Sequence, residues 1–473
     1  MLFNSLTFIV FFAIVLSLHY APFNWTTKKT NLLVASYLFY AAWNPPFVVL
    51  LWISTVVDWH VANALAREER PGRRKLLLTA SIAVNLGLLG FFKYGEFLLE
   101  NFIALAALAG VTYQPADWGI VLPVGISFYT FQTMAYSLDV YLRRAAPAKN
   151  FLDFALFVTF FPQLVAGPIV RPTQLIPQFA HHRIATAKQL YWGLALVTIG
   201  LFQKVVIADG LLAPTADQVF GSKDLLNPLD AWLGTLAFSG QIYSDFAGYS
   251  TTAIGVALAL GFSLPNNFNY PYAAIGFSDF WRRWHISLSS WLRDYLYIPI
   301  GGNRKGPVRT YINLMVTMLL GGLWHGAAWT FVVWGGLHGL YLAAERWLKA
   351  RFGDKAVWRS LLGKLFLALL TYFLVNITWV FFRAQDFATA WRMITAMLWF
   401  ATDGKPVLPN VYVLETILTI GAMLCIHWRM RERKLEHVVA AMPVWLIGLT
   451  WGAMLFLIII TQGGSNAFIY FQF

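Results

Sequence analysis

The sequence has 473 residues, of which 58% are hydrophobic, 17% aromatic and only 12% charged. With a mean hydropathy of +0.59, it has too few polar side chains to cover the surface of a soluble globular protein, which excludes that class. The net charge of +13 does not indicate nucleic-acid binding, because the basic residues fall in clusters between apolar runs, as in the cytoplasmic loops of membrane proteins. We therefore predict an all-α polytopic membrane protein.

The composition also limits the metal and redox chemistry of the chain. Its single cysteine, Cys425, excludes an intrachain disulfide and a metal site built from cysteines. The pair His181-His182 lies beside Arg183 in a polar loop, and the nearby sequence supplies no further carboxylate or imidazole ligands. We expect no metal and no permanently bound cofactor.

The N-terminal third predicts a series of membrane crossings. The stretch from Met1 to Ala21 is apolar with no basic region ahead of it, so we expect a retained first span with its N-terminus outside. Residues 31–64 are interrupted at Asn44-Pro45-Pro46, which predicts two shorter helices. After these we expect a cytoplasmic basic loop, an outward span, an outer-face segment and a returning span, at residues 67–75, 76–92, 94–118 and 119–142.

The middle of the chain carries polar residues inside apolar runs. Residues 151–168 lie between basic flanks and contain two X-Pro steps, so a re-entrant hairpin is expected there. The long return span at 229–262 holds a polar patch that includes Gln241 and Asp245. A carboxylate at membrane depth is costly, so Asp245 is a candidate functional residue; the alternative is that it only joins neighbouring helices.

The segment from Phe280 to Tyr295 has the pattern of one amphipathic helix at the membrane interface. Its apolar residues recur at three- and four-residue steps, whereas its arginines lie off that stripe. His285 borders the stripe, and we expect it to point inward. Two roles remain open for it: an interfacial anchor, or a residue that lines the path of a substrate.

The longest apolar run, from Tyr311 to about Trp347, has basic residues at both ends, which predicts that both ends lie in the cytoplasm. The run must turn back, and Gly326-Ala327-Ala328 is the expected break. His325 precedes this break at membrane depth, where an imidazole is costly unless something uses it. From position alone His325 is either a general base or a structural histidine bonded to another helix. His338, further along the run, is expected to be structural.

Five stretches resemble the membrane-bound O-acyltransferase superfamily, and within it the branch that O-acetylates alginate and other bacterial polysaccharides. The most specific are RRWHISLSSWLRDYLYIPIGGNRKG from Arg282 and MLLGGLWHGAAWTFVVWGGLHG from Met318. The others are LPVGISFYTFQTMAYSLDVY at 122–141, FPQLVAGPIVR at 161–171 and QIYSDFAGYS at 241–250. The resemblance covers most of the chain up to about Trp347, while the C-terminal apolar runs at 365–462 match no motif.

The apolar runs predict about 11 transmembrane helices at roughly 20 residues per crossing, with re-entrant and interfacial helices between them. We find no internal repeat, so we expect one integral-membrane domain over residues 1–473 with its motif-bearing core at about 119–347. The resemblance implies that these helices surround a central tunnel. It also implies that the histidine of the Trp-His-Gly motif, His325, is catalytic, and His285 is the second catalytic candidate.

Acyl transfer from a thioester to a hydroxyl needs a base near the attacking oxygen and a donor for the oxyanion. Acetyl-coenzyme A is the expected donor substrate. Arg282 and Arg283 are candidates to hold its phosphates at the cytoplasmic mouth; the alternative is that they only set membrane topology. The further residues expected along the donor path are Trp281, Trp284, Trp324, Gln241 and Asp245.

We therefore expect an acetyltransferase of the bacterial inner membrane that serves O-acetylation of an exported polysaccharide, either directly or through a periplasmic acetyltransferase within a polysaccharide synthesis and export complex. Alginate, cellulose and peptidoglycan are not distinguished as acceptors by the sequence. One alternative is a transporter of acyl groups or glycans, although transporters usually contain internal repeats. The other is a non-catalytic scaffold, which predicts that His325 is replaceable.

Overall fold

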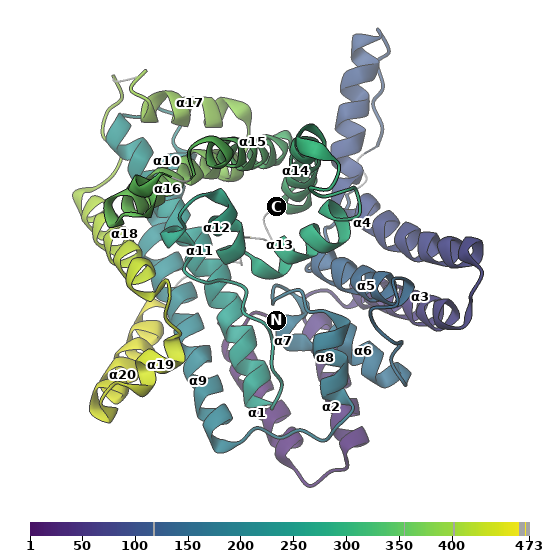
Figure 1. Ribbon diagram of the computed structural model, residues 1–473. Helices are drawn as coiled ribbons and strands as arrows, with labels where there is room; N and C mark the ends of the chain where they lie inside the picture. The colour runs from purple at the N-terminus through teal and green to yellow at the C-terminus, as the bar shows by residue number, and fades with distance from the viewer. Residues whose placement is uncertain (117–118, 354, 401–402, 463–468, 470–473) are drawn as a thin grey trace. The chain divides into compact units, whose positions relative to one another are not determined.

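The computed structural model describes residues 1–116, 119–353, 355–400, 403–462 and 469. Within these ranges the regular elements are all helices (Figure 1), which confirms the predicted all-α class. The chain forms two compact units, one of Met1–Leu194 with Ala253–Pro265 and the other of Ala195–Thr252 with Asn266–Phe473. They are named the first and second units below.

In the first unit, one predicted break between helices is confirmed and another is wrong. A break at Asn44-Pro45-Pro46 separates α2 from α3, because proline cannot continue the helix that precedes it. The predicted separation of residues 76–92 from 94–118 is wrong, since α4 is one helix that starts at Pro71, where a first-turn proline is tolerated, and meets no later proline. The helices of this unit are α1 (Leu6–Tyr20), α2 (Trp25–Ala41), η1 (Pro45–Phe47), α3 (Val48–Arg67), α4 (Pro71–Leu108), α5 (Ile126–Tyr141), α6 (Phe151–Thr159), α7 (Phe161–Leu164), α8 (Pro172–Phe179) and the start of α9 (Ala187–Leu201).

Buried hydrogen bonds join α3, α4 and α5 inside this unit. The carboxylate of Asp58 is fully buried and accepts hydrogen bonds from the hydroxyls of Ser81 and Ser137 and from Asn85 Nδ2 at 2.7 Å. Ser54 donates to Asn85 Oδ1 at 2.7 Å. Because apolar helices gain little by leaving lipid for one another, such polar contacts select the partners with which they pack.

The second unit holds the motifs that the sequence analysis singled out. The end of α9 and most of α11 belong to it, and its core is rich in aromatic side chains, including the fully buried Trp284, Trp334 and Trp379. Its helices are η2 (Phe202–Leu212), α10 (Ala213–Gly221), α11 (Pro228–Ala259), η3 (Pro271–Ala273), α12 (Phe277–Arg283), α13 (Ile286–Leu292), η4 (Arg293–Tyr297), α14 (Gly306–His325), α15 (Trp329–Phe352), η5 (Ala356–Arg359), α16 (Leu361–Arg383), α17 (Phe387–Met397), α18 (Asn410–Met430), α19 (Leu435–Ala440) and α20 (Val444–Thr461).

Six helical stretches among the described residues are long and apolar enough to cross a membrane: Pro45–Arg67, Pro71–Leu108, Ala187–Gly221, Leu361–Arg383, Asn410–Met430 and Val444–Thr461. They carry many exposed large hydrophobic side chains; in α20 only Ile458 is buried. An apolar surface of this kind fits contact with lipid. The chain is thus a multi-pass membrane protein, and the predicted number of about 11 spans stays a prediction.

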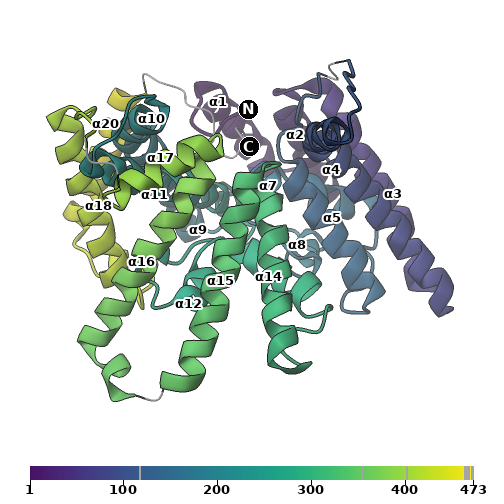
Figure 2. The ribbon, with the colours of Figure 1, turned by 90° about the horizontal axis from the view of Figure 1, so that it is seen from above.

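The long apolar run folds into the predicted hairpin. α14 ends at His325, α15 begins at Trp329, and the two lie side by side in Figure 2. A side chain at Gly322 would collide with the carbonyl oxygen of Phe331 and meet the Gly335 Cα at 3.1 Å. Glycine is therefore required on α14 for this close approach, which fixes the positions of the two helices relative to each other.

The single amphipathic helix predicted for Phe280–Tyr295 is wrong. The segment is divided into α12, α13 and η4, and His285 lies at the break between α12 and α13 with φ of 42° and ψ of 55°. This left-handed conformation costs a non-glycine residue energy and persists only where the surroundings hold it. Apolar spacing cannot detect such a break, because the hydrophobic period continues across it.

We predict that Gly322→Ala destabilises the second unit by about 1 to 3 kcal/mol, since the added methyl group forces α14 away from α15. Gly336→Ala is the matched control on α15, because its Cβ would meet Leu319 Cδ2 at an ordinary 3.5 Å. Thermal unfolding of both variants in detergent tests this. Equal midpoints for the two variants would contradict the role of the close approach.

Candidate active site

His325 is the last residue of α14, and its side chain is 2% exposed. The centroids of three aromatic rings lie close to its imidazole, at 4.9 Å for Trp334, 5.0 Å for Trp324 and 5.4 Å for Phe382. These three rings, from α15, α14 and α16, are called the aromatic cage below. Apolar surroundings favour the neutral form of an imidazole, which is the form that can accept a proton.

The residue after His325 allows this packing. A side chain at Gly326 would collide with the ring of Phe331, which in turn contacts Phe382 of the cage at a centroid distance of 4.9 Å. Gly326 has an extended backbone, which any residue can adopt. Glycine is required at this position because there is no space for a side chain. The Trp-His-Gly sequence thus supplies a cage ring, the imidazole and the room for the turn to α15.

His285 lies in the same unit, and its ring centroid is 6.3 Å from that of His325. It is fully buried, with Phe246 at 4.7 Å and Trp324 at 5.8 Å between ring centroids. His285 lies outside the six candidate spans, and burial lowers its pKa to about 3, so the imidazole is neutral near pH 7. The structure therefore brings the two predicted catalytic histidines together.

The tryptophans predicted to line the donor path form one cluster with the cage. Trp281 of α12 contacts Trp334 at 5.8 Å, and Trp284, directly after α12, contacts Trp379 of α16 at 5.0 Å between centroids. Within the described residues, the indole N–H groups of Trp281, Trp284 and Trp334 have no hydrogen-bond partner. Buried donors of this kind normally have a partner, so they are available to a bound molecule or to water.

His338 has a partner that supports the predicted structural role. Its Nε2 lies 3.1 Å from the hydroxyl oxygen of Thr378 on α16. That hydroxyl donates its own proton to the carbonyl of Val375, so it accepts from His338. His338 thereby joins α15 to α16 behind Trp334, whose ring is 4.7 Å away.

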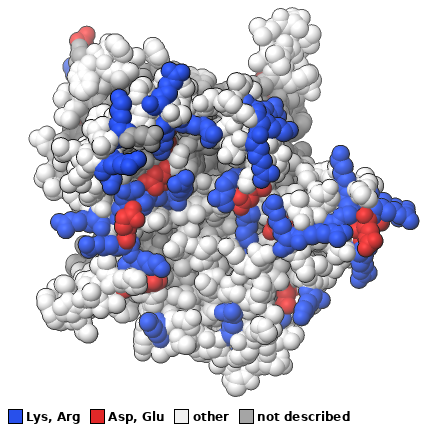
Figure 3. Space-filling model, in the orientation of Figure 1, with Lys and Arg blue, Asp and Glu red and all other residues white. Residues whose placement is uncertain are grey.

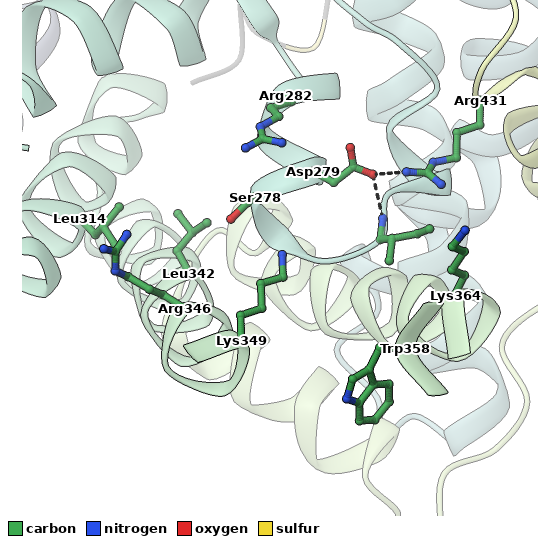
Figure 4. Close-up of a pocket in the computed structure, with 11 residues that line it drawn as sticks. Ser278, Asp279, Arg282, Leu314, Leu342, Arg346, Lys349, Trp358, Lys364 and Arg431 are labelled. Carbon is green, nitrogen blue, oxygen red and sulfur yellow. Dashed lines mark hydrogen bonds and ion pairs between the residues drawn. The ribbon is translucent and has the colours of Figure 1, made fainter. Parts of the chain in front are cut away.

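The structure separates the two arginines that were predicted to act together. Arg283 is 7% exposed, pairs with Asp279 at 2.9 Å and donates to the carbonyls of Asn269 and Arg431, so its guanidinium holds α12 to its neighbours. Arg282 projects instead into a cavity of about 660 Å³ (Figure 4). Only Arg282 of the pair lines that cavity.

The cavity, called the basic cavity below, is lined by five cationic side chains and one acidic side chain. The cations come from α12, α15, α16 and the end of α18, and blue side chains gather over this part of the surface in Figure 3, while much of the remaining visible surface is white. The indole of Trp358 adds a flat apolar surface. The charged lining residues are Arg282, Arg346, Lys349, Lys364, Arg431 and Asp279.

Asp279 organises one side of the basic cavity. It accepts hydrogen bonds from the Ile275 N–H and from Arg283, and Arg431 contacts it at 2.8 Å (Figure 4). Burial alone would raise the pKa of Asp279, but the N–H group and the two guanidinium groups outweigh burial, and the pKa lies below its ordinary value. The ionised carboxylate therefore stabilises the fold.

We predict that Asp279→Asn lowers thermal stability at pH 7, and that the difference from the parent protein shrinks as the pH falls below about 4. The sign follows from the lowered pKa: the carboxylate stabilises the fold above its unfolded pKa of about 3.9, and this is lost as the pH falls through the folded value. Unfolding midpoints measured across this range test it, with the exposed Asp224→Asn as control. A difference that does not depend on pH would refute the ionic contribution.

Asp245, the predicted intramembrane carboxylate, belongs to a buried ionic cluster. Lys204 Nζ lies 2.5 Å from Asp245 and 2.9 Å from Asp209, and the other carboxylate oxygen of Asp245 accepts the Ile469 N–H at 2.8 Å. Lys204 and Asp209 are five residues apart in η2, a π-helical segment, so they face the same side. Gln241 is buried on the same helix as Asp245 and takes no part in these ion pairs.

Several of these residues were missed by the sequence analysis. Lys204 and Asp209 left a visible signal, since both are charged residues inside an apolar run. Arg346 and Lys349 were interpreted only as topology signals. Trp334 and Phe382 could not be distinguished from other aromatic residues of their runs, because packing against His325 leaves no local pattern. In the part of the chain that the structure describes, no group of three or more histidine, cysteine, aspartate or glutamate side chains is placed to bind a metal ion.

The family model for membrane-bound O-acyltransferases (MBOAT) matches residues 143–382, which is just over half of the chain and includes both histidines, the cage and α12. The chain belongs to the membrane-bound O-acyltransferase family. It is therefore an O-acyltransferase, and the resemblance noted in its motifs is confirmed.

Several curated proteins are similar in sequence to most of this chain. It is 44% identical over 413 residues to the probable alginate O-acetylase AlgI of Pseudomonas aeruginosa, covering 85% of this chain and 76% of the relative. The protein of the same name from Azotobacter vinelandii is 43% identical over 404 residues, covering 85% and 78%. A peptidoglycan O-acetyltransferase of Helicobacter pylori is 39% identical over 396 residues, covering 78% and 73%.

Proposed function

We propose that this acyltransferase is an inner-membrane acetyltransferase that takes acetyl groups from acetyl-coenzyme A on the cytoplasmic side and serves the O-acetylation of an exported polysaccharide, alginate or cellulose. The observation that carries the proposal is the pair of buried histidines, His285 and His325, whose ring centroids lie 6.3 Å apart in the unit that also holds the basic cavity. The names of the relatives support acetyl as the transferred group and a polysaccharide as the final acceptor.

His325 acts as the general base in this proposal. Its neutral imidazole takes the proton of the acceptor hydroxyl, the oxygen attacks the thioester carbonyl, the C–S bond breaks and the proton passes to the leaving thiolate. The products are an ester and a free thiol, and the imidazole returns to its neutral form. The indole N–H groups of Trp281 and Trp334, which lack partners within the described residues, are candidates to stabilise the oxyanion.

The basic cavity binds the nucleotide part of the donor. Its five cations match the phosphates of coenzyme A, its volume of about 660 Å³ is in the range of nucleotide-sized ligands, and Trp358 offers a surface on which a base can stack. Consecutive residues of α12 connect the two regions: Arg282 lines the cavity, whereas Trp281 contacts Trp334 of the cage. A donor held by its phosphates would thus extend its thioester along α12 toward His325.

The acceptor side follows from the expected topology. Basic clusters at both ends of the α14–α15 hairpin favour a cytoplasmic location of those ends by the positive-inside rule, and the turn beside His325 would then point toward the outer face. The acetyl group would leave there for the polysaccharide itself or for a periplasmic acetyltransferase in the synthesis and export complex. A transporter or a scaffold would not need a base at His325, so one substitution separates these alternatives.

We predict that His325→Gln lowers kcat for acetyl transfer by about 10²- to 10⁴-fold, as expected for loss of a general base, while the protein still inserts and folds. The control is His427→Gln, because His427 is equally buried on α18 and accepts the Tyr272 N–H through its own ring nitrogen at 3.3 Å. Transfer of labelled acetyl from acetyl-coenzyme A by the purified protein is measured. Full activity of a well-folded His325→Gln variant would refute acyl-transfer catalysis at this residue.

We predict that the double variant Arg282→Gln/Arg346→Gln raises KM for acetyl-coenzyme A by at least about tenfold with a smaller change in kcat, because both residues contribute to ground-state binding. The control Arg304→Gln/Arg351→Gln removes two charges from exposed positions that do not line the cavity. If both double variants raise KM equally, general surface charge and not the basic cavity binds the donor.

A further inference from the structure

Asn267, which lies in the segment between α11 and α12, makes an unusual set of contacts beside His285. Its side chain is 1% exposed. The amide oxygen Oδ1 lies 2.8 Å from the Ser287 hydroxyl, 3.2 Å from the Ser287 backbone nitrogen and 3.2 Å from His285 Nδ1. Three groups thus converge on one oxygen atom.

These contacts determine which nitrogen of His285 carries the proton. The backbone nitrogen of Ser287 can only donate, so the amide atom that faces it must be the oxygen and not the NH₂ group. An amide oxygen can only accept, so His285 must donate from Nδ1. A neutral His285 then carries its proton on Nδ1, and Nε2 is the ring nitrogen that accepts.

Backbone hydrogen bonds also attach the segment around Asn267 to the break between α12 and α13. The Ile286 N–H donates to the Asn267 carbonyl, and the Asn269 N–H donates to the Arg283 carbonyl, both at 2.9 Å. These bonds join the segment to both sides of the break between α12 and α13. The left-handed conformation of His285 at that break costs about 1 to 3 kcal/mol, so it needs partners of this kind. Asn267 therefore fixes the backbone and the ring of His285 together.

We propose that Asn267 is the positioning residue of His285: it holds the imidazole with the proton on Nδ1, so that Nε2 is the nitrogen that serves proton transfer beside His325. This rests on the proposed function, in which the two histidines act at one site. Other catalytic histidines are held in the same way: a polar partner on one ring nitrogen fixes the tautomer and orients the other nitrogen toward the reacting group.

The surroundings of His285 make its protonation sensitive to Asn267. Among the rings that contact it are those of Phe246, Phe268 and Trp324, which do not titrate, and that of His325, which does. The bonds to Ser287 on α13 involve neutral groups alone. A charge introduced at position 267 would lie at hydrogen-bonding distance from His285 Nδ1 and would act directly on the protonation of the ring.

The decisive variant is Asn267→Asp, which keeps an oxygen for both Ser287 donors and for His285 Nδ1 but adds a negative charge. An adjacent carboxylate favours the imidazolium, so the activity loss on the acid side should begin at a pH higher by about 1 unit or more than in the parent protein. If Asn267 only caps α13, aspartate replaces it as a cap and the pH profile stays unchanged, which would overturn the proposal.

A spectroscopic test does not depend on catalysis. The protein is labelled with ¹⁵N-histidine, and the His285 signals are assigned by their loss in His285→Gln. We expect the Nδ1–H tautomer in the parent protein and a shift toward Nε2–H or a mixture in Asn267→Ala, whereas Ser287→Ala should keep Nδ1–H because it leaves the bond to Asn267 in place. An Nε2–H tautomer in the parent protein, or the same change in both variants, would overturn the proposal.

The two tests also separate this inference from the proposed function. If His285→Gln transfers acetyl at the parent rate, His285 has no part in the reaction, yet the tautomer measurement still decides whether Asn267 orients it. If the tautomer is as expected and Asn267→Ala lowers kcat while KM for the donor is unchanged, Asn267 acts through His285 and not through donor binding.

Discussion

The close contact of α14 with α15 is the constraint on which the rest of the site depends. Gly322 allows α14 to approach the backbone of Phe331 and Gly335, and this brings His325 against Trp334. Without that approach His325 on α14 would lose its contact with Trp334 on α15. The packing of two helices thereby defines the aromatic surroundings of His325.

The short helix α12 connects this buried environment to a polar one. Trp281 and Trp284 pack toward α15 and α16, Arg283 is bound by its neighbours, and Arg282 projects into the basic cavity. Successive residues of one helix thus meet an apolar cluster and a set of cations. Acetyl-coenzyme A carries phosphates at one end and a thioester at the other. In the proposed function the phosphates bind the cations of the basic cavity, and the thioester lies in the apolar cluster near His325.

Much of this could be predicted from the sequence, and the failures have physical causes. The all-α membrane class and the break after His325 followed from apolar runs and basic flanks, and the motifs singled out the two histidines that the structure brings together. The break at His285 did not, because a hydrophobic period continues across a change of φ at one residue. The contribution of Asn267 was also invisible, since it depends on three donors that meet only after the chain folds. Arg282 and Arg283 looked equivalent in sequence, and only packing separates them.

The most direct test of the account is a cryo-electron microscopy structure of the protein with a thioether analogue of acetyl-coenzyme A, which binds as the donor does but cannot transfer its acyl group. We expect density for the phosphates in the basic cavity, within hydrogen-bonding distance of Arg282 and Arg346, and for the acyl end inside the aromatic cage next to His325. An analogue bound elsewhere, or one that enters the cavity with its acyl end directed away from His325, would contradict it.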